Sequence, residues 1–204
     1  MGSQSTQRLA DRICEAGLYV KPHPGFGVRD SFLPAGTYCD PTILNADVIR
    51  EELGLEPGQN APLVEFVLDR APKIFVAIAC LERPRAQACQ IMQDFMDHEF
   101  DDGRLPIKLD YCNSSPAFSG GWTRNMKLLF YKGQWEHLAP LFSGTNFYFR
   151  IEPEQPLPFL EPENGIQRAP EGASSIVHKV IIHEDHLVDF PSDVGYSARE
   201  RHKI

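Results

Sequence analysis

The spacing of apolar residues changes along the chain, from a helical period in its larger front part to an alternating period further on. Apolar residues recur every three or four positions, and this pattern predicts helices over 6–17, 46–53, 62–70, 72–83, 85–98 and 122–132. Asn45 is placed to cap the second helix and Gly54 to end it, and Pro72 suits the first turn of the fourth. The segment "QWEHLAPLF" at 134–142 is expected to complete the helical region.

The helix around "KIFVAIACLER" is apolar on nearly every side, so we expect it at the centre of the helical core. Side chains predicted to be buried there are Phe75, Ile78, Phe95, Leu129, Trp135 and Leu141. The first helix is expected to turn Leu9, Ile13 and Cys14 inward. Cys80 and Cys89 lie in apolar segments and are interpreted as core residues.

Strand signals begin after residue 145. "FYFRI" at 147–151 alternates, "SSIVHKVII" at 174–182 is alternating and rich in β-branched residues, and "LPFL" at 157–160 suits a short strand. The connecting segments are rich in Pro, Glu and Gly, which are typical of loops. The pattern therefore predicts an α+β fold, with helices first and antiparallel strands afterwards.

Three regions follow from this division. We expect a helical domain over 1–145, an incomplete antiparallel strand piece over 146–190 and a disordered tail over 191–204, which has no periodicity.

Composition narrows the function classes. The 204 residues carry a net charge of -8, which argues against nucleic acid or an anionic membrane as the main partner. The longest apolar run, 73–81, is far shorter than the roughly 20 residues of a membrane span. "MGSQSTQRLADR" at the start has no apolar signal core, so we expect a cytoplasmic protein. The five cysteines are scattered without a CxxC pair, which disfavours disulfide scaffolds and zinc ribbons.

Two polar clusters contain residue types that occur in metal or hydrolase sites. His183 and His186 form an HxxH pattern after a strand, where a metal site would need two histidines on one helical face and a carboxylate, so a structural role is favoured. The acidic cluster comprises Asp97, Glu99, Asp101 and Asp102. We interpret it as a solvated loop that caps the next element rather than as a paired-acid hydrolase site. No local motif singles out a Cys–His nucleophilic pair.

Five segments in a fixed order carry a family resemblance. They are "KIFVAIACL", "DDGRLPI", "QWEHLAPLF", "LPFLEP" and "VHKVIIHEDH". Together they resemble fungal protein-kinase-like proteins, which have a helical region ahead of the kinase fold. The resemblance covers roughly 30–190. It implies that 146–190 corresponds to the glycine-loop hairpin at the start of a kinase N-lobe.

The resemblance places a degenerate nucleotide loop at "PEGASSIV". A kinase loop reads GxGxxGxV, because glycines let backbone N–H groups approach the phosphates. With Val177 as the valine, the glycine positions fall on Pro170, Gly172 and Ser175, so one glycine remains. Gly172, Ser175 and Val177 are the cofactor-binding candidates that the family implies.

The resemblance also implies that the catalytic parts of a kinase are missing. The HRD and DFG elements have no counterpart here, and an Ala-x-Lys pattern laid on Ala198 places Glu200 at the lysine position. We therefore expect a truncated, non-catalytic relative without a cofactor: a regulatory or interaction module, or a gene remnant. It would bind a protein partner or self-associate through the strand at 174–182.

Two alternatives stay open. The chain can be the N-terminal fragment of an ATP-dependent serine/threonine protein kinase, in which case ATP and magnesium enter only with the missing part. It can also be an unrelated binding module whose similarity ends at the helices.

Overall fold

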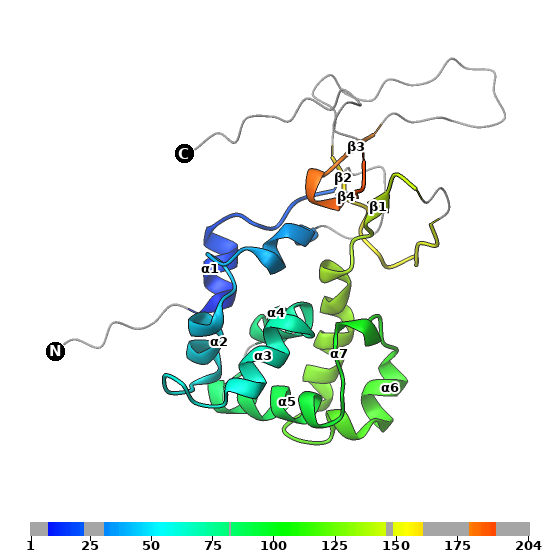
Figure 1. The fold of residues 1–204 in the computed structure, drawn as a ribbon. Helices are drawn as coiled ribbons and strands as arrows, with labels where there is room; N and C mark the ends of the chain where they lie inside the picture. Colours follow the sequence, from blue (N-terminus) through cyan, green and yellow to red (C-terminus); the bar gives the residue numbers. More distant parts are fainter. Residues whose placement is uncertain (1–7, 23–30, 82, 146–148, 161–179, 191–204) are drawn as a thin grey trace, which may run out of the picture.

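The computed structural model describes residues 8–22, 31–81, 83–145, 149–160 and 180–190. Within these ranges the chain is α+β, with a body of helices and, beyond one end of it, a few short strands (Figure 1). The α-helices are α1 (Leu9–Glu15), α2 (Ala46–Leu53), α3 (Ala61–Asp69), α4 (Pro72–Ala79), α5 (Arg85–Asp97), α6 (Leu109–Ser114) and α7 (Arg124–Gly133). None of the helices in this part of the chain is both long and apolar enough to cross a membrane.

Short 3-10 turns connect or extend these helices. They are η1 (Ala35–Cys39), η2 (Asp102–Arg104), η3 (Pro116–Phe118), η4 (Gln134–His137) and η5 (Glu184–His186). The strands are β1 (Phe142–Ser143), β2 (Phe159–Leu160), β3 (Ile181–Ile182) and β4 (Leu187–Val188).

Local signals set several helix ends as predicted. The Asn45 side chain accepts hydrogen bonds from the backbone N–H groups of Asp47 and Val48, both at 3.0 Å, and so caps α2. Gly54 ends that helix in the left-handed conformation at φ +68°, which favours glycine because it has no Cβ. Pro72 occupies the first position of α4, where its missing N–H costs nothing.

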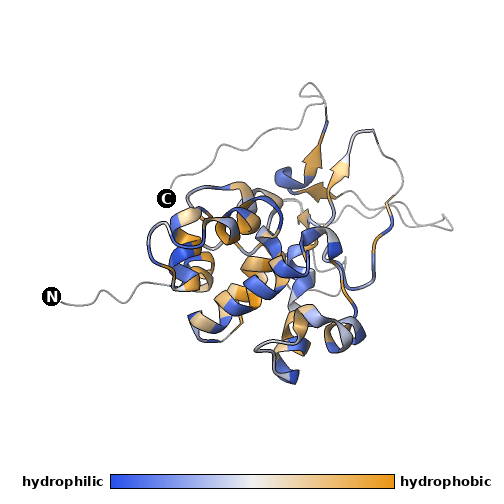
Figure 2. Cartoon of the chain, turned by 60° about the horizontal axis from the view of Figure 1, so that its bottom comes forward, coloured by the Kyte–Doolittle hydropathy of each residue, from blue (hydrophilic) through white to orange (hydrophobic). Residues whose placement is uncertain are grey.

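The core sits between the helices, and α4 runs through it. Phe75 and Ile78 of α4 are fully buried, as are Phe95 of α5 and Phe130 of α7. Five rings pack together with centroid distances of 4.7 to 6.2 Å: Phe95, Phe100, Phe118, Trp122 and Phe130. In Figure 2 the apolar positions gather on helix sides that face one another, and the polar positions line the outside. The helical core is therefore centred as the pattern predicted.

Four predicted core residues are corrected. Cys80 is exposed just after the end of α4, whereas Cys89 is half-buried and packs against the core. Cys14 is exposed, because α1 presents only Leu9 and Ile13 to the body. Leu129 is 45% exposed and Leu141 is 47% exposed, although their apolar character suggested burial. Leu129 lies on α7 beside a surface groove, and Leu141 follows the last turn of the body. Trp135, by contrast, is buried as expected.

The strands form two separate two-stranded sheets. β1 pairs with β4 in parallel, with Phe142 opposite Leu187, and β2 pairs with β3 in antiparallel fashion, with Phe159 opposite Ile182. The strand predicted at 157–160 is thus confirmed in its second half. Residues 149–151 of the strand predicted at 147–151 carry no strand pairing, which is a correction.

The segment around β4 lies directly against the helical body. The parallel β1–β4 pair joins the end of the predicted helical region to residues 187–188, a contact that the sequence did not suggest. A parallel pair needs its two strands to be brought together by distant chain segments, so no local turn signal marks it. Residues 187–188 of the predicted strand piece are therefore paired with the end of the helical region.

Candidate functional site

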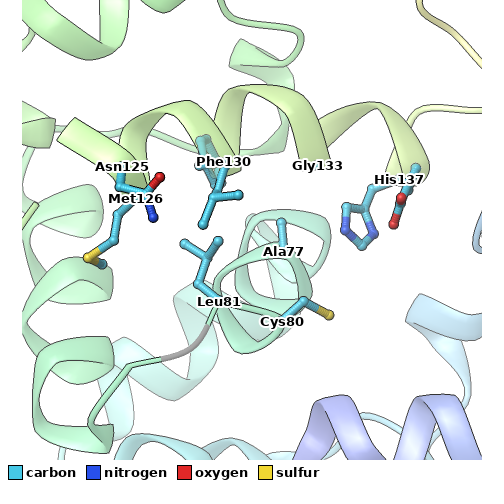
Figure 3. A pocket seen from close by; sticks show the side chains of 10 residues that line it. Ala77, Cys80, Leu81, Asn125, Met126, Phe130, Gly133 and His137 are labelled. Carbon is cyan, nitrogen blue, oxygen red and sulfur yellow. The ribbon is translucent and has the colours of Figure 1, made fainter. Parts of the chain in front are cut away.

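A surface groove with a volume of about 430 Å³ lies along one face of α7 and η4, with the C-terminal end of α4 as its opposite wall (Figure 3). This wall consists of Ala77 of α4 and of Cys80 and Leu81, which follow that helix directly. Those from α7 and η4 are Asn125, Met126, Leu129, Phe130, Gly133, Glu136 and His137. The volume lies within the usual range of ligand pockets, about 300–1,000 Å³.

The floor of the groove follows from the helical spacing of α7. Met126 and Phe130 are four positions apart, so they lie on one face, and both are buried. The Thr123 hydroxyl accepts a hydrogen bond from the Met126 N–H at 3.2 Å and fixes where this face begins. Leu129, beside them at the rim, stays 45% exposed. The groove is thus apolar at its centre and leaves one leucine open to solvent.

Gly133 lines the groove where α7 passes into η4. A Cβ atom built at this position meets nothing within 4 Å. Its backbone is right-handed, at φ -71° and ψ -27°, so the conformation does not require glycine. A larger side chain at position 133 would fill free space in the groove.

His137 lines one end of the groove, is 3% exposed, and has Tyr38 of η1 as its hydrogen-bond partner. A hydrogen bond of 2.7 Å joins the Tyr38 hydroxyl to Nδ1 of His137. Burial, and to a smaller extent the Lys73 ammonium, lowers the pKa of His137 to about 3. Burial also raises the pKa of Tyr38 well above its ordinary value. The pair is therefore neutral across the physiological pH range.

Cys80 lines the same groove, next to Tyr19. The Tyr19 hydroxyl and the Cys80 sulfur are 3.6 Å apart, and burial raises the pKa of the Cys80 thiol. A Cys–His mechanism needs a thiolate and a histidine that is basic near neutral pH. Here the thiol is held protonated, and the pKa of His137 makes it a weak base. The groove brings these two side chains to one surface, with the thiol protonated and the imidazole a weak base.

The acidic cluster serves the fold. The Asp102 carboxylate accepts hydrogen bonds from the backbone N–H groups of Lys73 at 2.9 Å and Ile74 at 3.0 Å, and so caps α4. Asp101 accepts from the Gly103 N–H and pairs with the Arg70 guanidinium. The prediction that this loop caps the next element is confirmed for Asp101, which caps η2. Asp102 instead caps α4, which precedes it in the sequence. Burial raises the pKa of Asp102.

The HxxH pair also has a structural place. Nδ1 of His183 accepts a hydrogen bond from the Asp185 N–H at 3.3 Å and caps η5. His186 is buried and bonds to two other segments through its two ring nitrogens. Among the described residues there is no group of three or more His, Cys, Asp or Glu side chains that could hold a metal ion.

The nucleotide-loop candidates Gly172, Ser175 and Val177 lie outside the described residues. The groove itself was missed by sequence reasoning, because its leucine and phenylalanine positions repeat with the same period as core positions. The only local signal was Gly133, a glycine inside an apolar helical stripe.

Arg83 is the least satisfied charged side chain in the described part of the molecule. It is 5% exposed, and none of its three guanidinium nitrogens has a hydrogen-bond partner there. Burial lowers its pKa to about 10, against the favourable influence of Glu52. Arg8 reaches the same region, with a hydrogen bond of 2.8 Å to the Arg83 carbonyl and an ion pair with Glu52.

No family model, curated protein or solved structure matches this chain. The relationship to fungal protein-kinase-like proteins therefore stays a hypothesis that rests on the order of five sequence segments.

Proposed function

We propose that this chain is a non-catalytic binding module, and that the groove along α7 accepts the apolar face of a helix from a partner protein. The observation that carries the proposal is the exposed Leu129 above a buried apolar floor, with free space over Gly133. Amphipathic helices dock into such grooves through apolar residues spaced three or four positions apart.

The length of the groove suits such a partner. It extends from Asn125 to His137, which spans roughly 18 Å at 1.5 Å per residue. That distance accommodates three turns of a partner helix laid along α7. The wall formed by the end of α4 supplies Ala77 and Leu81, which add apolar contact on the other side.

The protonation states favour binding over chemistry. His137 is bonded to Tyr38 and is not a base of useful strength, and the protonated Cys80 thiol is a poor nucleophile. A groove with these groups can orient a ligand but has little means to transform it.

The binding proposal is tested by selecting helical peptides from a displayed library against the intact chain. We expect enriched peptides to carry apolar residues at positions i, i+3 or i+4, and i+7. Leu129→Glu places a charge at the rim and Gly133→Phe fills the free space, so each should weaken binding at least tenfold. Leu68→Glu is the matched control, because Leu68 is 37% exposed on α3, outside the groove. Peptides that bind Leu129→Glu as well as the unchanged chain would contradict the proposal.

The proposal also includes that the chain is related to protein kinases but has no kinase activity itself. The purified chain is then expected to transfer no phosphate from Mg-ATP to a generic protein substrate. Millimolar ATP should also shift its melting temperature little. A stabilisation above about 2.7 kcal/mol would correspond to ATP at about 100 times its dissociation constant, and would contradict the degenerate loop at Gly172, Ser175 and Val177.

The alternative, an N-terminal fragment of an ATP-dependent serine/threonine protein kinase, makes a different prediction. The genomic reading frame downstream would then carry an Ala-x-Lys strand followed by HRD and DFG elements.

A further inference from the structure

Two buried histidines form hydrogen bonds with η1. The Tyr38 hydroxyl bonds to His137, as described above, and the Ala35 N–H donates to Nε2 of His186 at 3.3 Å. His186 comes from η5, more than a hundred residues further along the chain. It is 1% exposed, so water cannot replace the bonds that it makes.

The two bonds of His186 fix its protonation state. Its Nδ1 lies 3.0 Å from the Pro140 carbonyl oxygen, which can only accept, so Nδ1 carries a hydrogen and donates it. Its Nε2 faces the Ala35 N–H, which can only donate, so Nε2 must present a lone pair. Both conditions hold only for the neutral ring. A proton on Nε2 would make it a donor facing the Ala35 N–H, which is also a donor, so this hydrogen bond would be lost.

The surroundings of His186 oppose a positive charge. The Phe32 and His183 rings stand edge-on to it, with centroids 5.3 and 6.0 Å away. Burial has the largest effect in lowering the pKa of His186, and the charges of His183 and Lys73 act in the same direction. Asp185 and the bond to the Pro140 carbonyl act in the opposite direction.

This histidine stands where the strand-bearing segment meets the helical body. Directly after His186, β4 pairs with β1, and the Gly144 N–H donates to the Val188 carbonyl at 3.1 Å. Asp185 lies so close to η1 that a Cβ atom on Gly36 would be 2.6 Å from its Oδ2. Besides the two-residue strand pairs, the segment 181–188 is held by the bonds of His186 and by the His183 N–H, which donates to the Pro158 carbonyl at 2.9 Å.

We infer that His186 is an acid-sensitive latch, which holds residues 181–188 on η1 and β1 when neutral and releases them when protonated. The step takes one proton from solvent onto Nε2, breaks the bond from the Ala35 N–H and exposes the imidazolium to water. Release uncovers the edge of β1 at Phe142 and Ser143, which can then pair with another strand.

The test is amide hydrogen exchange of the intact chain at pH 7.5 and pH 5.5, corrected for the intrinsic effect of pH on exchange. We expect protection at 181–188 to fall with one-proton dependence, by up to about tenfold for a histidine whose pKa is near 6.5 once released. Protection in α5 should change much less. Equal protection at 181–188 at both pH values, or an equal loss in α5, would overturn the inference.

Two variants assign the effect to this histidine. His186→Asn keeps a donor for the Pro140 carbonyl and cannot gain a proton, so protection at 181–188 should be low at both pH values. His98→Asn is the matched control, because His98 is exposed at the end of α5, and it should retain the full pH dependence. A pH dependence that persists in His186→Asn would overturn the assignment. If His186→Asn does not fold, the comparison of the unchanged chain with α5 as internal reference still decides.

Discussion

The helical body and the strand-bearing end of this molecule are held by different kinds of contact. The body, from α1 to η4, encloses one apolar core in which Phe75 and Phe95 have no exposed surface. The strand-bearing end depends on two-residue strand pairs and on the bonds of His186. Of the large apolar side chains that are exposed in the described part of the chain, this end contributes Leu141, Ile151, Ile181 and Val188.

This difference indicates how stability is distributed. Apolar burial stabilises in proportion to area, at roughly 25 cal/mol per Å², and the helices share one core, so the body should unfold as a unit. A two-stranded pair is marginal by itself, so the strand-bearing end should open locally at a lower free energy. The predictions below are ordered from the largest expected effect to the smallest.

Phe75→Ala should lower the free energy of unfolding of the whole body by about 3–5 kcal/mol, the usual cost of truncating a buried aromatic ring. Phe75 lies in α4 with 0% exposure, so the cavity would open at the centre of the core. Denaturant unfolding followed by circular dichroism measures the change. Leu141→Ala is the control, because a side chain that is 47% exposed should cost less than about 1 kcal/mol. Equal losses for the two variants would break the comparison between body and strand-bearing end.

Asp102→Ala should cost about 1–2 kcal/mol, because it leaves two backbone N–H groups at the start of α4 without an acceptor. The loss tests whether the body depends on polar contacts as well as on its apolar core. Asp97→Ala is the control, since this carboxylate of the same cluster is exposed and bonds only locally, to Gln93. It should change the unfolding free energy by less than about 0.5 kcal/mol. An equal effect of both changes would mean that the cap contributes nothing specific.

The sequence predicted those features that local residues decide. Asn45, Gly54 and Pro72 act within one turn of their own helices, so their types alone place the ends of α2 and the start of α4. The apolar period likewise identified α4 as central, because a helix that is apolar all round must be enclosed.

The sequence pattern did not predict the contacts between distant segments. Leu129 belongs to the same apolar stripe of α7 as the buried Met126 and Phe130. It lies at the rim of the groove because α4, which ends at Ala79, does not cover it. The β1–β4 pair and the His186 bonds join segments separated by more than forty residues, for which no local signal exists. The candidate site was missed for this reason. A periodic stripe does not reveal whether a neighbouring element covers it along its whole length.

The smallest expected effects come from replacing a glycine by alanine, once in the body and once in the strand-bearing end. Gly133→Ala lies at the end of α7 in right-handed backbone with free space around it, so it should stabilise the body by about 0.5–1 kcal/mol. Gly144→Ala should act in the opposite direction, because its Cβ would stand 2.8 Å from the Asp189 carbonyl oxygen and push β4 away from β1.

The two glycine variants are distinguished by what each measurement reports. Thermal unfolding should register Gly133→Ala as a small rise in the melting temperature and Gly144→Ala as almost no change. Hydrogen exchange should respond to Gly144→Ala and not to Gly133→Ala. We expect faster exchange of the backbone N–H at position 144, which donates to the Val188 carbonyl, only in Gly144→Ala. We expect this result if the strand-bearing end opens while the body stays folded. A contact that exists only when that end is closed then changes the free energy of local opening and not that of global unfolding. A Gly144→Ala variant with a markedly lower melting temperature would mean that the two regions unfold together, and that His186 and the strand pairs belong to the same cooperative unit as Phe75.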